Sequence, residues 1–465
     1  MRRLLLLILS IIFSSHTFAQ DLNHISKTDK LYALTNYWKE VEYNFVYFNK
    51  VDKEKWKKSY QKLLTEVAEL NDFEYYRNLQ KLSALLNDGH TQIYFPEYLE
   101  KILVHGEFGN FKISTALVEG KVVISRISQN KKDILPIGTE IIKVNNKPVA
   151  QYIQEEVEPY LSESSIHVKK LKAAQRVFTH VKGTPYHVEF KTPKGKSVAL
   201  DLKLNPSQNL EMYPVFPQMN AFSSKWLGDK IYYVKLQSFE KSSLYTEFLK
   251  VLPEMKSAKG VILDIRYNGG GSSAVARNIA QHLINDSLIY GAKNQSRLII
   301  PTDRALGSFL SAQDTIEGKK DWGLTKEQTL TYYKSAQGYL YHDYPFSPIK
   351  INQNVEKVVI PTIILTESST ASAAEDFLIY TNKQSHIKRM GNYTNGSTGQ
   401  PLTLALPNGG EAWICTKKVS FPDGTEFVGT GIKPHIKAEF TLKDLIKIED
   451  SVLDQAVREL RTVKN

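Results

Sequence analysis

Three apolar, β-branched runs in the second half of the chain constrain the fold more than any other feature. They span residues 230–239, 260–266 and 358–366, and a segment with helical spacing follows each of them. Strands that alternate with helices are typical of parallel sheets, because a parallel connection has to cross back over the sheet. The pattern therefore predicts an α/β domain, which we place at residues 218–445, followed by a helix at 446–465.

The first part of the chain is predicted to be helical. Apolar residues recur at spacings of three and four within residues 31–45, 56–70 and 76–86, which is the period of amphipathic helices. Asn71 or Asp72 is a natural cap for the third helix, and Gly89 ends it. Residues 90–95 read as a short strand. We place an N-terminal helical domain at residues 20–98.

Strands dominate the stretch between these two parts. Alternating segments flank the turns at 119–120 and 193–195, and one helical section at 149–171 interrupts them. Residues 205–217 are polar and contain proline, so a linker is expected there. The chain thus divides into a helical domain, a β-rich domain at 105–204 and the α/β domain. The fold class is α/β, or α+β when all the domains are taken together.

Residues 1–19 have the composition of a secretory signal peptide. A basic start precedes an apolar stretch, and Thr17-Phe-Ala19 is a small-x-small cleavage pattern. We expect export to the periplasm or the extracellular space, with Gln20 as the mature N-terminus. No later stretch approaches ~18 consecutive apolar residues, so no integral membrane span is expected after cleavage. Cys415 is the only cysteine and cannot form an internal disulfide.

The charge of the chain does not indicate a nucleic-acid partner. The formal net charge is +11, but the lysines occur in short scattered runs and form no single basic stripe. A solvated surface explains such scattering. A metal site is not expected either, because no His-Glu-x-x-His is present and one cysteine excludes thiolate zinc sites. The sequence predicts no metal and no organic cofactor.

Ser372 lies where a nucleophile is expected. It follows the apolar run at 358–365 and precedes a segment at 371–380 that reads as a helix. A serine at such a turn is held at the edge of a sheet, close to the free N–H groups and the positive dipole end of the helix. An N-capping serine is the alternative interpretation, because serine is favoured wherever a helix starts.

Two further features could assist a serine nucleophile. The strand at 261–266 runs into Tyr267-Asn-Gly-Gly-Gly271, whose N–H groups could face a reacting carbonyl, although a glycine-rich turn is the alternative. His90 directly follows the Asp88-Gly89 turn and is the candidate base among eleven histidines. The Gly-x-Ser-x-Gly motif of α/β-hydrolases and the phosphate-binding glycine motifs are missing.

Five motifs in order resemble those of the C-terminal-processing (tail-specific) serine peptidases. They are Leu86-Asn-Asp-Gly-His-Thr91, residues 135–149, Asp264-Ile-Arg-Tyr-Asn-Gly-Gly-Gly271, Ser369-Thr-Ala-Ser-Ala-Ala-Glu375 and Gly429-Thr-Gly-Ile-Lys-Pro434. The resemblance implies a PDZ-like domain that contains the second motif and a peptidase domain with a crotonase-like α/β fold. It also implies Ser372 as the nucleophile, with the N–H groups of Gly270 or Gly271 and of Ala373 forming the oxyanion hole.

One departure from the family pattern concerns the base. The tail-specific branch uses a lysine in a Gly-Lys-Gly turn, and the aligned stretch here, Asn395-Gly-Ser-Thr-Gly399, carries Ser397 instead. The chain is therefore more similar to the tricorn-core and retinoid-binding-protein branch. The tricorn core uses serine, histidine and glutamate, which implies His90 as the base and makes Glu426 the nearest candidate for the third residue. Glu426 could instead be an ordinary exposed strand residue.

These observations lead to the hypothesis of an exported serine endopeptidase that acts on proteins or peptides. Ser372 would form an acyl-enzyme and His90 would accept its proton. A displaced Ser-Lys dyad with Lys383 or Lys388 would be a different solution to the same chemistry. The residues are also compatible with a non-catalytic member of the family that binds a peptide or lipid, and with an esterase that uses the same apparatus.

Overall fold

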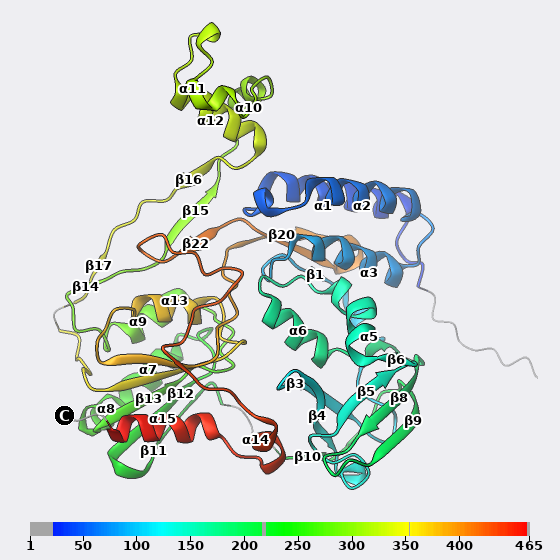
Figure 1. The fold of residues 1–465 in the computed structure, drawn as a ribbon, viewed down its shortest axis with the longest axis vertical. Coiled ribbons are helices and arrows are strands. Elements are labelled where there is room, and N and C mark those ends of the chain that lie inside the picture. The colour runs from blue at the N-terminus through cyan, green and yellow to red at the C-terminus, as the bar shows by residue number, and fades with distance from the viewer. Residues whose placement is uncertain (1–21, 216–219, 353, 463–465) are drawn as a thin grey trace, which may run out of the picture.

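The computed structural model describes residues 22–215, 220–352 and 354–462 of the 465-residue chain. The expected signal segment at 1–19 and the expected mature terminus Gln20 lie outside the described residues. Within them, the helical part, the β-rich part and the α/β part follow one another along the chain (Figure 1). The predicted fold class is confirmed.

The N-terminal part consists mainly of helices, and residues from the α/β part of the chain complete their hydrophobic core. Asn71 caps α3 in a reciprocal capping box with Glu74, as the sequence predicted. The strand β1 is shorter than expected and pairs antiparallel with β21. The elements here are α1 (Lys27–Asn44), η1 (Phe48–Lys50), α2 (Lys53–Glu66), α3 (Asp72–Ser83), η2 (Ala84–Leu86), β1 (Ile93–Tyr94) and α4 (Glu97–Glu100).

The core of this part includes Ile414 and Cys415 from β21, packed with the buried faces of α1 and α3. This sharing brings the segment after α3, which carries His90, to the α/β part of the chain.

The β-rich part contains a seven-stranded sheet with two helices against it, and β2 and β7 form a separate two-stranded sheet. Part of the expected linker adds a strand, since β10 pairs with β4. The elements are β2 (Leu103–His105), β3 (Ile113–Val118), β4 (Lys121–Ser128), η3 (Gln129–Lys131), β5 (Glu140–Val144), β6 (Lys147–Pro148), α5 (Val149–Glu156), η4 (Glu158–Tyr160), α6 (Ile166–Gln175), β7 (Thr179–Val181), β8 (Pro185–Lys191), β9 (Ser197–Lys203) and β10 (Met212–Tyr213).

The α/β part is built on a six-stranded sheet in the order β11-β12-β13-β18-β19-β23, parallel except at β11. Its main elements are β11 (Phe222–Trp226), β12 (Ile231–Leu236), α7 (Ser243–Lys250), α8 (Leu252–Ser257), β13 (Gly260–Asp264), α9 (Ser273–Ala280), β18 (Thr362–Thr366), α13 (Ala373–Tyr380), β19 (Ile387–Gly391), β23 (Ile436–Lys437), α14 (Leu442–Lys447) and α15 (Ser451–Thr462).

Side chains of this sheet alternate between two cores because successive residues of a strand point to opposite faces. Along β12, Val234 and Leu236 face α7, α9 and α13, whereas Ile231 and Tyr233 face α15. The central strands are covered on both faces, which is why every residue of β13 and β18 is buried.

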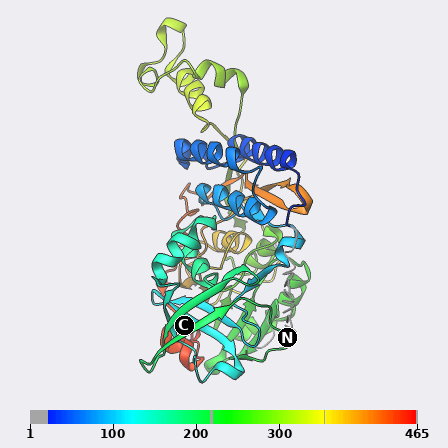
Figure 2. The ribbon, with the colours of Figure 1, turned by 90° about the vertical axis from the view of Figure 1, so that its right-hand side faces the viewer.

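An extension that the sequence pattern did not predict stands away from the rest of the molecule (Figures 1 and 2). It contains the helices α10, α11 and α12, which follow β15 and precede its antiparallel partner β16.

The elements between β13 and β22 that have not yet been given are β14 (Leu288–Ile289), β15 (Lys293–Arg297), α10 (Pro301–Gly307), α11 (Asp314–Glu317), η6 (Lys320–Trp322), α12 (Lys326–Gln337), β16 (Tyr341–Asp343), β17 (Ile349–Lys350), β20 (Pro401–Ala405), η7 (Pro407–Gly409), β21 (Glu411–Cys415) and β22 (Lys418–Ser420).

Candidate active site

Three loops meet at the carboxyl edge of the parallel sheet. The glycine cluster follows β13, Ser372 follows β18, and the loop at 394–397 follows β19. These strands are neighbours in register, since Asp264 pairs with Leu365 and Leu365 pairs with Met390. Parallel strands deliver the loops after their carboxyl ends to one edge of the sheet, where ligands of such sheets bind. The sheet topology therefore gathers residues that are far apart in the sequence.

Ser372 is at a strained turn just before α13. Its backbone angles are φ 54° and ψ −122°, a region that few residues other than glycine adopt. The turn is held in place by Thr370, whose hydroxyl donates to the Ile265 carbonyl (3.0 Å), and by the Ala371 N–H, which donates to the Asn268 carbonyl (3.0 Å). Among the described residues, the Ala373 N–H has no acceptor, so it is free to bind an oxyanion.

The glycine cluster lies directly against this turn. A Cβ at Gly270 would lie 2.7 Å from the Ser372 Cβ and 2.9 Å from the Ala373 nitrogen, so only glycine fits there. The Gly270 N–H already donates to the Asn268 side chain (2.9 Å), and Asn268 is fully buried. The exposed Gly271 has no acceptor for its N–H in the described part of the chain. Gly271 is therefore the glycine whose donor is free.

Glu375 joins the loops together, although the sequence reasoning did not single it out. Its fully buried carboxylate accepts four hydrogen bonds, from the Ser372 N–H (3.2 Å), the Thr394 hydroxyl (2.6 Å), the Gly396 N–H (2.8 Å) and the Ser397 N–H (3.2 Å). Burial nevertheless raises the pKa of Glu375 to about 8. The signal was present in the sequence, because Ser372 and Glu375 have the spacing of a capping box.

His90 reaches the same loops through Ser397. The Nδ1 atom of His90 lies 2.7 Å from the Ser397 hydroxyl, and the Ser397 carbonyl accepts a hydrogen bond from the Ser372 N–H (3.1 Å). One residue thus contacts both predicted catalytic residues, and it is the residue that stands where the family pattern has lysine. A single residue spans about 4 Å, so the His90 ring and the Ser372 N–H lie within about 10 Å of each other.

The structure places Ser372 and His90 in one site without a direct hydrogen bond between them among the described residues. Catalytic hydrogen bonds are often long before substrate binds. That the two residues act together stays a prediction. A distance of tens of ångströms between them would exclude it, and the link through Ser397 shows that they are much closer than that.

The electrostatics around His90 favour a neutral imidazole. Burial, with the positive charges of Lys417 and Lys172, lowers the pKa of His90 to about 4. Asp88 holds the backbone of the same turn, since its Oδ1 accepts from the His90 N–H (3.0 Å) and the Thr91 hydroxyl (2.9 Å). Burial raises the pKa of Asp88 to about 6. A neutral histidine is the form that accepts a proton.

Glu426 does not contact His90 in this structure. Its carboxylate pairs with Lys418 (2.5 Å) and Lys50 (3.2 Å), and its side chain is 43% exposed. Hydrogen bonds and charge from Lys418 and Lys50 lower the pKa of Glu426, and no histidine contributes to this shift. The role of Glu426 as the third catalytic residue stays a prediction without a supporting contact.

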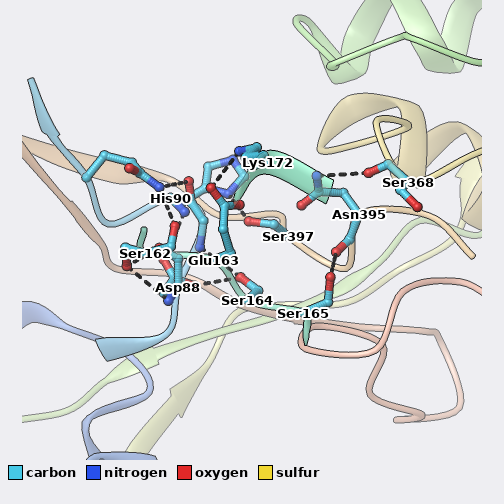
Figure 3. A network of polar contacts seen from close by, with 12 residues as sticks. Asp88, His90, Ser162, Glu163, Ser164, Ser165, Lys172, Ser368, Asn395 and Ser397 are labelled. Carbon is cyan, nitrogen blue, oxygen red and sulfur yellow. Dashed lines mark hydrogen bonds and ion pairs between the residues drawn. The ribbon is translucent and has the colours of Figure 1, made fainter. Parts of the chain in front are cut away.

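A serine-rich segment before α6 contacts the loops that carry His90 and Ser397 (Figure 3). The Ser162 hydroxyl donates to the Asp88 carbonyl (2.9 Å), and the Ser164 hydroxyl accepts from the Gly89 N–H (2.9 Å). The Ser165 hydroxyl donates to the Asn395 carbonyl (2.7 Å). The β-rich part of the chain thus contacts both the loop of His90 and the loop of Ser397.

A large cavity in the described part of the chain is separate from these residues. It has a volume of about 1590 Å³ and lies between α3 and the β-rich part, lined among others by Arg77, Gln92 and Tyr160, while Ser372 and His90 do not line it. The chemistry of the residues, rather than the size of the cavity, identifies the candidate site. No cluster of three or more His, Cys, Asp or Glu side chains suited to a metal occurs within residues 22–215, 220–352 and 354–462.

Comparisons with known proteins identify the class. Residues 230–438 match the family model described as Peptidase family S41. The chain therefore carries a family S41 peptidase domain, which confirms the resemblance drawn from the five motifs and supports a serine peptidase. No curated protein sequence matches the chain.

Solved structures with the same fold cover almost the whole chain. Mature CPAF is 15% identical, with a TM-score of 0.67, covering 93% of this chain and 98% of its own. Mature CPAF complexed with lactacystin gives a TM-score of 0.65 at the same identity and coverage. A protein from Parabacteroides merdae ATCC 43184 is 17% identical, with a TM-score of 0.50, covering 95% and 98%. At these identities the likeness establishes the fold alone.

None of the helices in the described part of the chain combines the length and the apolar character that a membrane crossing needs.

Proposed function

We propose that this protein is a serine endopeptidase that hydrolyses proteins or peptides, with Ser372 as the nucleophile and His90 as the base. We also propose that it is exported to the periplasm or the extracellular space, on the composition of residues 1–19. The observation that carries the enzymatic proposal is the arrangement of Ser372, which sits in a strained turn at the start of α13 and is linked to His90 through Ser397.

The reaction proceeds through an acyl-enzyme. The Ser372 Oγ bonds to the carbonyl carbon of the substrate and its proton passes to His90, while the carbonyl oxygen becomes an oxyanion. The N–H groups of Ala373 and Gly271 hold that oxyanion, because the Gly270 N–H already donates to Asn268. His90 then gives its proton to the leaving amine as the C–N bond breaks. Water, deprotonated by His90, hydrolyses the ester and restores Ser372.

Ser397 takes an orienting role in this proposal. When the Nδ1–H group of His90 donates a hydrogen bond to the Ser397 hydroxyl, the Nε2 atom carries no proton. Its lone pair is then free, so Nε2 can act as the base. The 2.7 Å distance between Nδ1 and the Ser397 Oγ is that of a hydrogen bond, and the direction of this bond is part of the proposal. This role also explains how the site could work without the lysine base of the tail-specific branch. In this chain Ser397 stands at the place of that lysine and orients His90, and His90 is the base.

Labelling with a fluorophosphonate tests the nucleophile. The purified protein should be modified covalently at Ser372, and Ser372→Ala should abolish both the labelling and the cleavage of a denatured protein substrate. His90→Ala should slow both reactions by at least about 100-fold, the scale of general-base catalysis. Lactacystin, bound in a mature CPAF structure, is a second probe, since prior incubation with it should reduce the labelling.

Two results would refute the proposal. Cleavage that survives in Ser372→Ala would remove the nucleophile, and stoichiometric binding of peptide without labelling or cleavage would identify a non-catalytic binding protein. A requirement for Lys383 or Lys388 would point to a displaced dyad instead.

A further inference from the structure

The proposed mechanism leaves a charge without a partner. His90 becomes an imidazolium when it takes the proton of Ser372, and a buried cation is costly unless an anion is close. The cations whose charges act on His90 are Lys417 and Lys172, and both oppose its protonation. Glu426, the expected carboxylate, is paired with two other lysines.

Two other buried carboxylates near this turn, those of Asp88 and Glu375, already accept several hydrogen bonds. Asp88 uses Oδ1 for the His90 N–H and the Thr91 hydroxyl, and Oδ2 accepts a longer bond from Ser164 (3.4 Å). Glu375 receives four hydrogen bonds on its two oxygens. The Cys415 thiol, packed on the same turn, is buried and its pKa is raised by burial and by the charge of Asp88, so it supplies no anion.

Glu163 is a buried carboxylate near His90 that has a free oxygen. Its side chain is 3% exposed, and Oε1 pairs with Lys172 (2.7 Å). Oε2 is buried and has no hydrogen-bond partner among the described residues. An unpaired buried carboxylate oxygen is rare and requires an explanation.

The free oxygen lies beside the turn that carries His90. A Cβ at Gly89 would lie 3.6 Å from Glu163 Oε2 and 2.6 Å from Ser397 Oγ, the atom that contacts the His90 ring. Figure 3 shows Glu163, Lys172, His90 and Ser397 gathered in one cluster. The residues on either side of Glu163 bind this turn through Asp88 and Gly89, so the backbone that carries the carboxylate is fixed.

We propose that Glu163, contributed by the β-rich part of the chain, is the positioning residue that stabilises the protonated form of His90 during catalysis. The inference rests on the proposed function. The proton moves from Ser372 to His90 and then to the leaving amine, and Glu163 does not take part in this transfer. Lys172 balances the charge of Glu163 before the imidazolium forms.

A transition-state analogue makes the effect measurable. A peptide boronate that bonds to Ser372 places a negative boron centre beside His90, which favours the imidazolium and raises its pKa. The His90 pKa in this adduct is then followed by NMR of ¹³C-labelled histidine. Glu163→Gln should lower that pKa by about one unit, a tenfold change, because it removes a negative charge beside the turn of His90. Lys172→Met should raise it, because the charge of Lys172 opposes the protonation of His90.

Kinetics provide the second measurement. Glu163→Gln should reduce kcat by about 10-fold or more with little change in KM, because the interaction is stronger in the transition state than in the ground state. Glu158→Gln, a change of the same kind five residues earlier, is the matched control and should leave kcat within about twofold. Thermal unfolding checks that each variant is folded.

The outcomes separate the two proposals. If no boronate adduct forms at Ser372, the proposed function fails. If the adduct forms and Glu163→Gln leaves both the His90 pKa and kcat unchanged, the role of Glu163 is refuted while the serine peptidase stands. A loss of activity with an unchanged His90 pKa would make Glu163 only a structural support, which also overturns the inference.

Discussion

Replacing Glu375 with glutamine tests the most heavily hydrogen-bonded group of the site. Glutamine keeps the shape of the side chain but does not titrate. Burial raises the pKa of Glu375 from its ordinary value of 4.5 to about 8. The difference corresponds to about 5 kcal/mol, since each pKa unit is worth about 1.4 kcal/mol.

The sign follows from proton binding. Between pH 4.5 and pH 8 the folded protein holds a proton on Glu375 that the unfolded chain has lost. The contribution of this proton to stability is fully present below pH 4.5 and is lost as the pH rises through 8. The wild-type free energy of unfolding, minus that of Glu375→Gln, should therefore fall by up to about 5 kcal/mol over this range.

Urea unfolding of both proteins, followed by tryptophan fluorescence at pH 5, 6, 7 and 8, measures this difference. All other titrating groups are common to the two proteins and largely cancel in the subtraction. A difference that is independent of pH would contradict the raised pKa of Glu375. A difference that grows as the pH rises would show that the four donors keep the carboxylate ionised.

Four further predictions concern Ser372, His90 and Glu426. Ser372→Gly should be more stable than Ser372→Ala by about 1 kcal/mol in thermal unfolding, because glycine relieves the positive φ of 54°; equal stabilities would mean that the turn is not strained. The acid limb of kcat/KM should fall near pH 4 rather than near 6.5, because the folded pKa of His90 is lowered. For the same reason the wild type should lose up to about 3 kcal/mol of stability relative to His90→Gln as the pH falls from 6.5 to 4, and a limb near 6.5 would contradict both statements. Glu426→Gln should leave kcat/KM within about threefold, since Glu426 pairs with Lys50 and Lys418; a loss of 100-fold would restore it as the third catalytic residue.

The sequence predicted the elements that depend on local pattern. The three apolar runs form β12, β13 and β18 of a largely parallel sheet, and Asn71 caps α3. The extension with α10 to α12 was missed because no strong apolar period marks it as a unit. The strand expected at 90–95 is only Ile93–Tyr94, because residues 88–91 close a turn through the Thr91 N–H and the Asp88 carbonyl.

The residue types of the site were also readable from the sequence, because a serine between a strand and a helix and a glycine cluster after a strand are local patterns. Which partners these residues contact depends on how distant segments pack. Ser397 contacts His90, Glu426 pairs with surface lysines, and Glu163 reaches the site from the β-rich part. Local spacing determines where a chain turns and which face is apolar. Contacts between distant residues, such as His90 and Ser397, which are 307 positions apart, form only once the sheets and helices are assembled.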